Sequence, residues 1–140
     1  MQHLPIGERL TALKKPQRRH RLINDIPDDG GIFQKIVFDK LDGMWIVNGP
    51  NIDYEPRRED SIAGLASRSG IPPMQLILDH LCSDDGNAMI YAPFFNYSYG
   101  DLSMAYEAHL HPHTRMGLSD AGAHCGAICD GGMPTFMLTH

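Results

Sequence analysis

Short apolar runs alternate with helical stretches along this chain, and this alternation limits the possible fold more than any other feature of the sequence. The apolar and turn-forming residues predict two short helices within residues 4–24, a strand at 33–38 and a strand at 44–47. Further helices are expected at 61–69, 72–81 and 101–110, and further strands at 88–92 and 116–118. Helices and strands in this order, with short connections, are typical of an α/β fold with a parallel sheet.

The helix ends carry local signals. Pro16 can open the second helix, Ser61 and Asp101 can cap the N-termini of later helices, and Gly70 can supply a left-handed C-terminal residue. Pro72 and Pro73 suit the first turn of the helix that follows. Within that helix a stripe at helical spacing is expected to face the core, and it consists of Met74, Ile77, Leu78 and Leu81.

Charge and composition exclude several classes of protein. The chain has 12 basic and 17 acidic residues, a formal charge of −5, which is the wrong sign for a protein that must neutralise nucleic-acid phosphates. The basic cluster at residues 14–21 is interpreted as a solvated helix face. No stretch is long and apolar enough for a membrane span or a signal peptide, so a cytoplasmic protein with no membrane partner is expected. Three cysteines, an odd number, are expected to be reduced thiols.

The residues that could carry chemistry gather after the last expected strand. Asp120 and His124 lie among small residues in the segment Gly117-Leu-Ser-Asp-Ala-Gly-Ala-His-Cys-Gly-Ala-Ile-Cys-Asp130. Small residues allow a ligand or another backbone segment to approach closely, and the C-terminal ends of parallel strands face the active site in α/β folds. Asp120 is therefore a candidate catalytic residue. The alternative is that Asp120 caps the next turn and His124 fills a core position.

These residues resemble a known family. The segment Ser119-Asp-Ala-Gly-Ala-His124, followed by Ile128-Cys-Asp130 and by Pro134-Thr-Phe-Met-Leu-Thr-His140, is similar to the last-strand signature of the N-acyl-D-amino-acid deacylase branch of the metal-dependent amidohydrolases. Residues 33–38, residues 60–66 and Phe94-Phe-Asn96 resemble that branch in the same order. The resemblance covers nearly the whole chain, and only the segment around Asp120 is specific enough to count as a motif.

The resemblance implies a fold and a reaction. The family has a TIM-like (β/α)8 barrel, which needs about 250 residues, so residues 1–140 are expected to form the C-terminal portion of an incomplete barrel, as in a truncated reading frame that ends within an apolar run. Asp120 matches the Asp that contacts the zinc centre and takes a proton from a metal-activated water during hydrolysis of an N-acyl amino acid. His124 would contact the substrate carboxylate or support Asp120. The His-x-His ligands of the first strand have no counterpart here, so the missing N-terminal part of the barrel is an expected partner, and the isolated chain is expected to be inactive and to bind zinc weakly.

Other residues allow a second function class. His109-Leu-His-Pro-His113 could converge on zinc, but its place at a helix end ahead of the last strand favours a structural or solvated role. Cys125 and Cys129 are interpreted as small buried residues, and Asp130 as a turn or cap residue. The alternative to a hydrolase fragment is a small non-catalytic protein, either a histidine-rich metal binder or an interaction protein.

Overall fold

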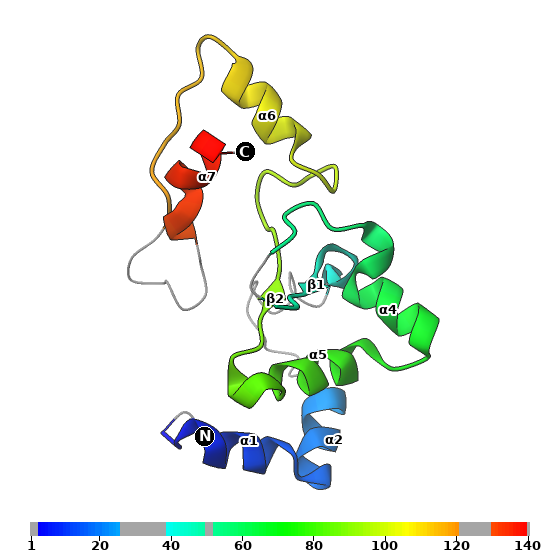
Figure 1. Ribbon diagram of the computed structural model, residues 1–140. Helices are drawn as coiled ribbons and strands as arrows, with labels where there is room; N and C mark the ends of the chain where they lie inside the picture. The colour runs from blue at the N-terminus through cyan, green and yellow to red at the C-terminus, as the bar shows by residue number, and fades with distance from the viewer. Residues whose placement is uncertain (1–2, 26–38, 50–51, 121–129, 140) are drawn as a thin grey trace. The chain divides into compact units, whose positions relative to one another are not determined.

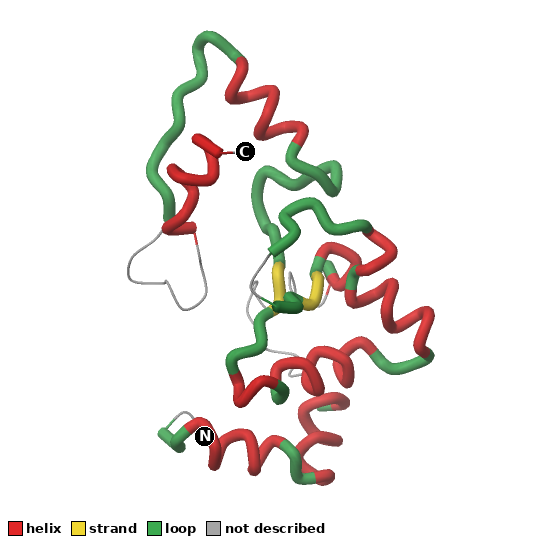
Figure 2. Tube along the Cα trace, in the orientation of Figure 1, coloured by secondary structure: helices red, strands yellow, loops and turns green. Residues whose placement is uncertain are grey.

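The computed structural model describes residues 3–25, 39–49, 52–120 and 130–139, the side chain of Asp130 excepted. The chain forms two compact units, Met1–Leu102 and Ser103–His140, and each is described by itself (Figure 1). The described residues are mainly helical, with one small two-stranded sheet (Figure 2). The strand expected at 33–38 lies outside the described residues.

Two helices begin the first unit, as the sequence predicts: α1 (Ile6–Leu13) and α2 (Pro16–Asn24), with Pro16 at the first helical position. Leu10 of α1 is buried, and α1 packs against the short 3-10 turn Asp84–Gly86. The basic cluster at 14–21 is exposed apart from Arg19, which is half-buried and forms an ion pair with Asp79. The solvated-face interpretation is thus confirmed, and Arg19 additionally joins α2 to the helix that carries Asp79.

Helix α4 (Ile62–Ser69) has the two ends that the sequence predicts. The Ser61 hydroxyl accepts a hydrogen bond of 3.2 Å from the backbone N–H of Gly64, and Gly70 ends the helix with φ +68°. An N-cap hydroxyl satisfies one of the four backbone donors that a helix N-terminus leaves unpaired. Ile62, the first helical residue, is fully buried, and its N–H donates a 2.8 Å hydrogen bond to the carbonyl oxygen of Met44.

Helix α5 (Pro73–Leu81) follows α4 and packs against it. Its N-terminus has Pro72 as the cap and Pro73 as the first helical residue, as expected. The stripe that was expected in the core is only partly covered: Met74, Ile77 and Leu78 are half-buried and Leu81 is exposed. At the C-terminal end of the helix the buried residue is Cys82, which directly follows Leu81.

The sheet pairs strand β1 (Trp45–Ile46) with strand β2 (Ile90–Tyr91), and the pairing is antiparallel. Both strands lie inside the runs expected at 44–47 and 88–92, but the prediction of a parallel sheet is wrong for these two. An apolar run does not specify the direction of its partner strand, so the composition of the two runs could not distinguish parallel from antiparallel pairing. Trp45 lies opposite Tyr91 and Ile46 opposite Ile90, and a further hydrogen bond of 3.1 Å joins Val47 to Met89.

The core of the first unit is small among the described residues. Its buried apolar residues are Leu10, Met44, Trp45, Ile62 and Cys82. The indole N–H of Trp45 donates a 2.9 Å hydrogen bond to the Arg57 carbonyl oxygen, so burial leaves this donor satisfied. This hydrogen bond and the pairing with Tyr91 together hold Trp45 in place in the sheet.

The second unit contains α6 (Ser103–Leu110) and α7 (Met133–Thr139). Helix α6 begins at Ser103, two residues later than the expected cap at Asp101. The strand predicted at 116–118 is wrong, because residues 114–120 form neither helix nor strand, and Leu118 is 99% exposed. Its apolar residues reach no partner strand among the described residues. No helix among the described residues is long and apolar enough to cross a membrane.

Candidate functional site

Asp120, the residue that sequence reasoning places at the centre of catalysis, lies at the end of the irregular segment 114–120 and is exposed to solvent. Its carboxylate has no hydrogen bond or ion pair to any residue that the structure describes. His124, Cys125 and Cys129 lie outside the described residues. Asp130 begins the 3-10 turn Asp130–Gly132, which fits the expected turn position of its backbone. The structure therefore leaves the Asp120 carboxylate accessible to a ligand.

The alternating histidines lie at the end of α6 and in the turn after it. His109 is in the last helical turn, where a cation complements the helix dipole. His111 and His113 are exposed, with ring centroids 5.6 Å apart, and the backbone N–H of His113 donates a 3.3 Å hydrogen bond to Nδ1 of His111. One ring nitrogen of His111 is thereby occupied. Across the described part of the chain, no group of three or more His, Cys, Asp or Glu side chains could hold a metal ion.

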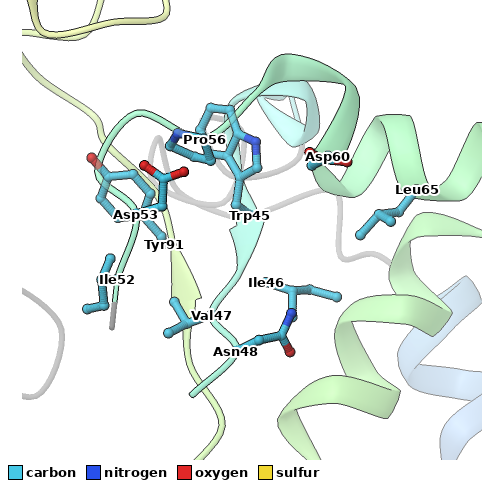
Figure 3. A pocket seen from close by; sticks show the side chains of 10 residues that line it. All are labelled: Trp45, Ile46, Val47, Asn48, Ile52, Asp53, Pro56, Asp60, Leu65 and Tyr91. Atoms are coloured by element: carbon cyan, nitrogen blue, oxygen red, sulfur yellow. The ribbon is translucent and has the colours of Figure 1, made fainter. Parts of the chain in front are cut away.

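A pocket of about 380 Å³ lies beside the sheet in the first unit (Figure 3). Its lining combines aromatic, aliphatic and acidic side chains, among them Trp45, Ile52, Asp53, Asp60, Leu65 and Tyr91. The two sheet strands supply the aromatic residues, since Trp45 and Tyr91 are opposite each other in the ladder. Pockets of this volume are in the range that binds small molecules.

The aromatic side chains of the pocket belong to a larger cluster. The ring centroids of Trp45 and Tyr91 are 6.1 Å apart, and the two ring planes make an angle of 36°. Tyr97 contacts both rings edge to face, with centroid distances of 6.1 Å to Trp45 and 6.5 Å to Tyr91. Tyr54 meets Tyr91 edge to face at 6.0 Å. Contacts of this geometry stabilise aromatic pairs beyond their buried area, so the cluster holds the wall of the pocket in place.

The electrostatic character of this region is negative. Burial, and then the nearby tyrosines and the carboxylates of Asp53 and Glu55, raise the pKa of Tyr91 to about 12. Burial and the carboxylates of Glu55, Asp101 and Asp53 also raise the pKa of Tyr97. Burial is the larger cause of both shifts, and the nearby carboxylates add to it because they disfavour a further negative charge.

The two carboxylates that line the pocket differ in their partners. Asp60 forms an ion pair of 3.1 Å with Arg68, so its charge is largely balanced. One oxygen of Asp53 accepts a 2.9 Å hydrogen bond from the backbone N–H of Glu55, and no described cation pairs with it. Asp53 is therefore the carboxylate whose negative charge is available in the pocket.

Sequence reasoning missed this pocket. The signal that could have found it is the concentration of aromatic and acidic residues in two separate segments, Trp45 with Asp53-Tyr-Glu55 and Tyr91 with Tyr97. Nothing in the sequence brings the two segments together, because their contact depends on the antiparallel pairing of β1 with β2.

No protein-family model matches this chain, and comparisons with curated proteins and with solved structures give no match either. The assignment of a function therefore depends on the residues of the chain itself.

Proposed function

We propose that this chain is part of a metal-dependent amidohydrolase that resembles the N-acyl-D-amino-acid deacylases. The complete enzyme hydrolyses the amide bond of an N-acyl amino acid or a related amide, and Asp120 is its proton acceptor. The observation that carries the proposal is the motif Ser119-Asp-Ala-Gly-Ala-His124 together with the residues that follow it. In the proposed enzyme these residues follow the last strand of a (β/α)8 barrel. Because residues 114–120 form neither helix nor strand in this chain, the proposal requires that this strand forms only against the N-terminal part of the barrel.

Two features of the described residues support this proposal. The Asp120 carboxylate is accessible. Large apolar side chains in the second unit are also uncovered, with Leu118 99% and Leu138 87% exposed. In the proposed enzyme the N-terminal part of the barrel covers these side chains.

The chemistry assigned to Asp120 suits a carboxylate. One carboxylate oxygen of Asp120 accepts a proton from the attacking water and then delivers it to the amine nitrogen as the amide C–N bond breaks. Zinc, when bound, would polarise the amide carbonyl and make a water molecule acidic enough to lose a proton near neutral pH. Asp120 fits zinc as a single oxygen ligand, and a catalytic zinc site takes three protein ligands, so the other ligands belong to the N-terminal part.

The test is to join this chain to the N-terminal half of a deacylase barrel and to measure hydrolysis of N-acyl-D-amino acids. The isolated chain should show no hydrolysis above background with zinc added, and the joined protein should gain activity. In the joined protein Asp120→Asn keeps the shape of the side chain but removes the proton acceptor, so kcat should fall by about 10²–10⁴-fold. The loss should be at least as large in kcat as in KM, because proton transfer occurs in the transition state.

His113→Asn is the matched control, because His113 is also an exposed residue of the second unit and the proposal gives it no catalytic part. It should change kcat by less than about tenfold. Unchanged turnover in Asp120→Asn would contradict the proposal. A collapse of activity in both His111→Asn and His113→Asn would place the active site on other residues and would favour a histidine-based metal site.

A further inference from the structure

The pocket beside the sheet has no part in the proposed hydrolysis, and its lining has a chemistry of its own. It joins two aromatic rings, a set of aliphatic side chains and one carboxylate without a cationic partner among the described residues (Figure 3). An anion would meet unfavourable charge here, because Asp53 and Asp60 line the pocket. The charge of Glu55 also helps to raise the pKa of Tyr91 and Tyr97 beside it. The ligand that this lining fits carries a positive charge and an apolar body.

Aromatic rings recognise such cations through their faces. A Trp or Tyr ring attracts an ammonium group within about 6 Å of its centroid, and the attraction is strongest for Trp. Trp45 and Tyr91 both line the pocket, and their ring centroids are 6.1 Å apart, so a cation in the pocket can lie within about 6 Å of both centroids. The Trp45 indole N–H is already bonded to the Arg57 carbonyl, which fixes the ring in this orientation before a ligand arrives.

Asp53 adds a charge at the same place. Its hydrogen bond from the Glu55 N–H holds the side chain in a local turn. Asp60 contributes less, because Arg68 balances it. The aliphatic residues Ile52 and Leu65 supply apolar surface for the body of the ligand.

We propose that this pocket binds an organic ammonium ion, with its charged nitrogen held by Asp53 and by the rings of Trp45 and Tyr91. The ligand class includes quaternary ammonium compounds and alkylated amines. The site lies within the first unit and is independent of the hydrolase assignment, so either idea can fail without the other.

The experiment uses the whole chain and its single tryptophan, Trp45, as the reporter. Choline is titrated at constant ionic strength while Trp45 emission is recorded, and ligand-observed NMR detects binding that leaves the emission unchanged. The comparison ligand is the neutral isostere of choline, in which carbon replaces the quaternary nitrogen. Choline should give a saturable response, and the isostere should bind at least about fivefold more weakly, since it lacks both the cation–π attraction and the attraction to the Asp53 charge.

Two substitutions test the role of Asp53. Asp53→Asn keeps an oxygen that can accept the Glu55 N–H and removes the charge, so choline should bind about fivefold more weakly. Glu8→Gln removes the same charge from α1, away from the pocket lining, and should leave choline binding unchanged. Because Asp53 and Glu8 are both exposed, neither change should prevent folding.

The Tyr91 ring is tested with a pair of variants. Tyr91→Phe keeps the ring and should retain choline binding, and Tyr91→Leu removes the aromatic face and should weaken it. If Tyr91→Leu fails to fold, Asp53→Asn and the neutral isostere still decide the matter. The proposal is overturned by equal binding of choline and its isostere, by unchanged affinity in Asp53→Asn, or by the absence of any saturable response to choline.

Discussion

Gly64 lies so close to Glu59 that a Cβ added to Gly64 would stand 2.1 Å from the Glu59 carbonyl oxygen. The contact is with backbone, which cannot rotate away as a side chain can. Gly64→Ala should therefore destabilise the chain by about 1–3 kcal/mol, as overpacking does, although alanine is the better helix former. Urea unfolding would measure this loss.

Gly7 of α1 is the matched control, because nothing lies within 4 Å of an added Cβ there. Gly7→Ala should stabilise the chain by about 0.4–1 kcal/mol, since it restricts the unfolded chain without any clash. Replacing glycine by alanine is thus expected to lower the free energy of unfolding at position 64 and to raise it at position 7. Equal effects would mean that Gly64 is not confined as described.

The Ser61 cap supplies a second stability prediction. Its hydroxyl accepts the Gly64 N–H and is almost completely buried, so Ser61→Ala leaves that donor without its partner. The expected cost is about 1 kcal/mol. Ser67→Ala, at an exposed position of the same helix, should change stability by less than about 0.5 kcal/mol. Similar losses in the two variants would argue against a capping role.

High pH should weaken the first unit. The pKa of Tyr91 is raised to about 12 from an ordinary value of 10.0, chiefly by burial, so the folded state holds the phenolic proton more tightly than the unfolded chain does. The stabilisation is complete below pH 10 and is lost as the pH rises through about 12. Ultraviolet absorbance of tyrosinate should show late titration, because the pKa of Tyr97 is raised as well, and the Tyr91 part of it should disappear in Tyr91→Phe. Ionisation of Tyr91 at the ordinary pKa would contradict this prediction.

The isolated chain is expected to associate with itself. Leu118 and Leu138 are nearly fully exposed, and covering a leucine side chain is worth about 1.5–3 kcal/mol. Sedimentation should reveal association that depends on concentration and decreases in the double variant Leu118→Ser, Leu138→Ser. Thr135→Ser, a conservative change at another exposed position, should have no such effect. A monomer that unfolds cooperatively would instead favour a self-contained domain.

Zinc should neither bind tightly to this chain alone nor increase its helix content. No described group of three ligand side chains could hold the ion, and proteins that depend on a structural zinc fold on binding it. Calorimetry and circular dichroism with added zinc would test this expectation. Tight binding that is lost in His111→Asn would favour the non-catalytic metal-binding alternative over the proposed hydrolase.

The helix ends could be predicted from the sequence because they depend on neighbours in the chain. Pro16 and Pro73 have a fixed φ that suits a first helical turn, and Ser61 and Gly70 satisfy or end a helix through atoms a few residues away. Such signals remain valid whatever the rest of the molecule does.

The sheet and the pocket depend on contacts between residues far apart in the sequence, and these were harder to predict. The runs that contain Trp45 and Tyr91 were predicted as strands, but their pairing was predicted as parallel and is antiparallel, because the apolar content of a run does not specify its partner strand. The strand expected before Asp120 failed for the same reason: residues 116–118 are apolar enough for a strand but have no described neighbour to pair with. The choice of Asp120 came from a motif and stays a prediction.

The burial of Cys82 makes it possible to measure local opening in the first unit. Its thiol lies at the end of α5 and is 7% exposed, so a bulky thiol reagent can reach it only when this part of the chain opens. In a Cys125→Ser, Cys129→Ser background, the labelling rate divided by the rate in the unfolded chain gives the equilibrium constant for that opening. Labelling of this one thiol thus gives the free energy of a local opening reaction.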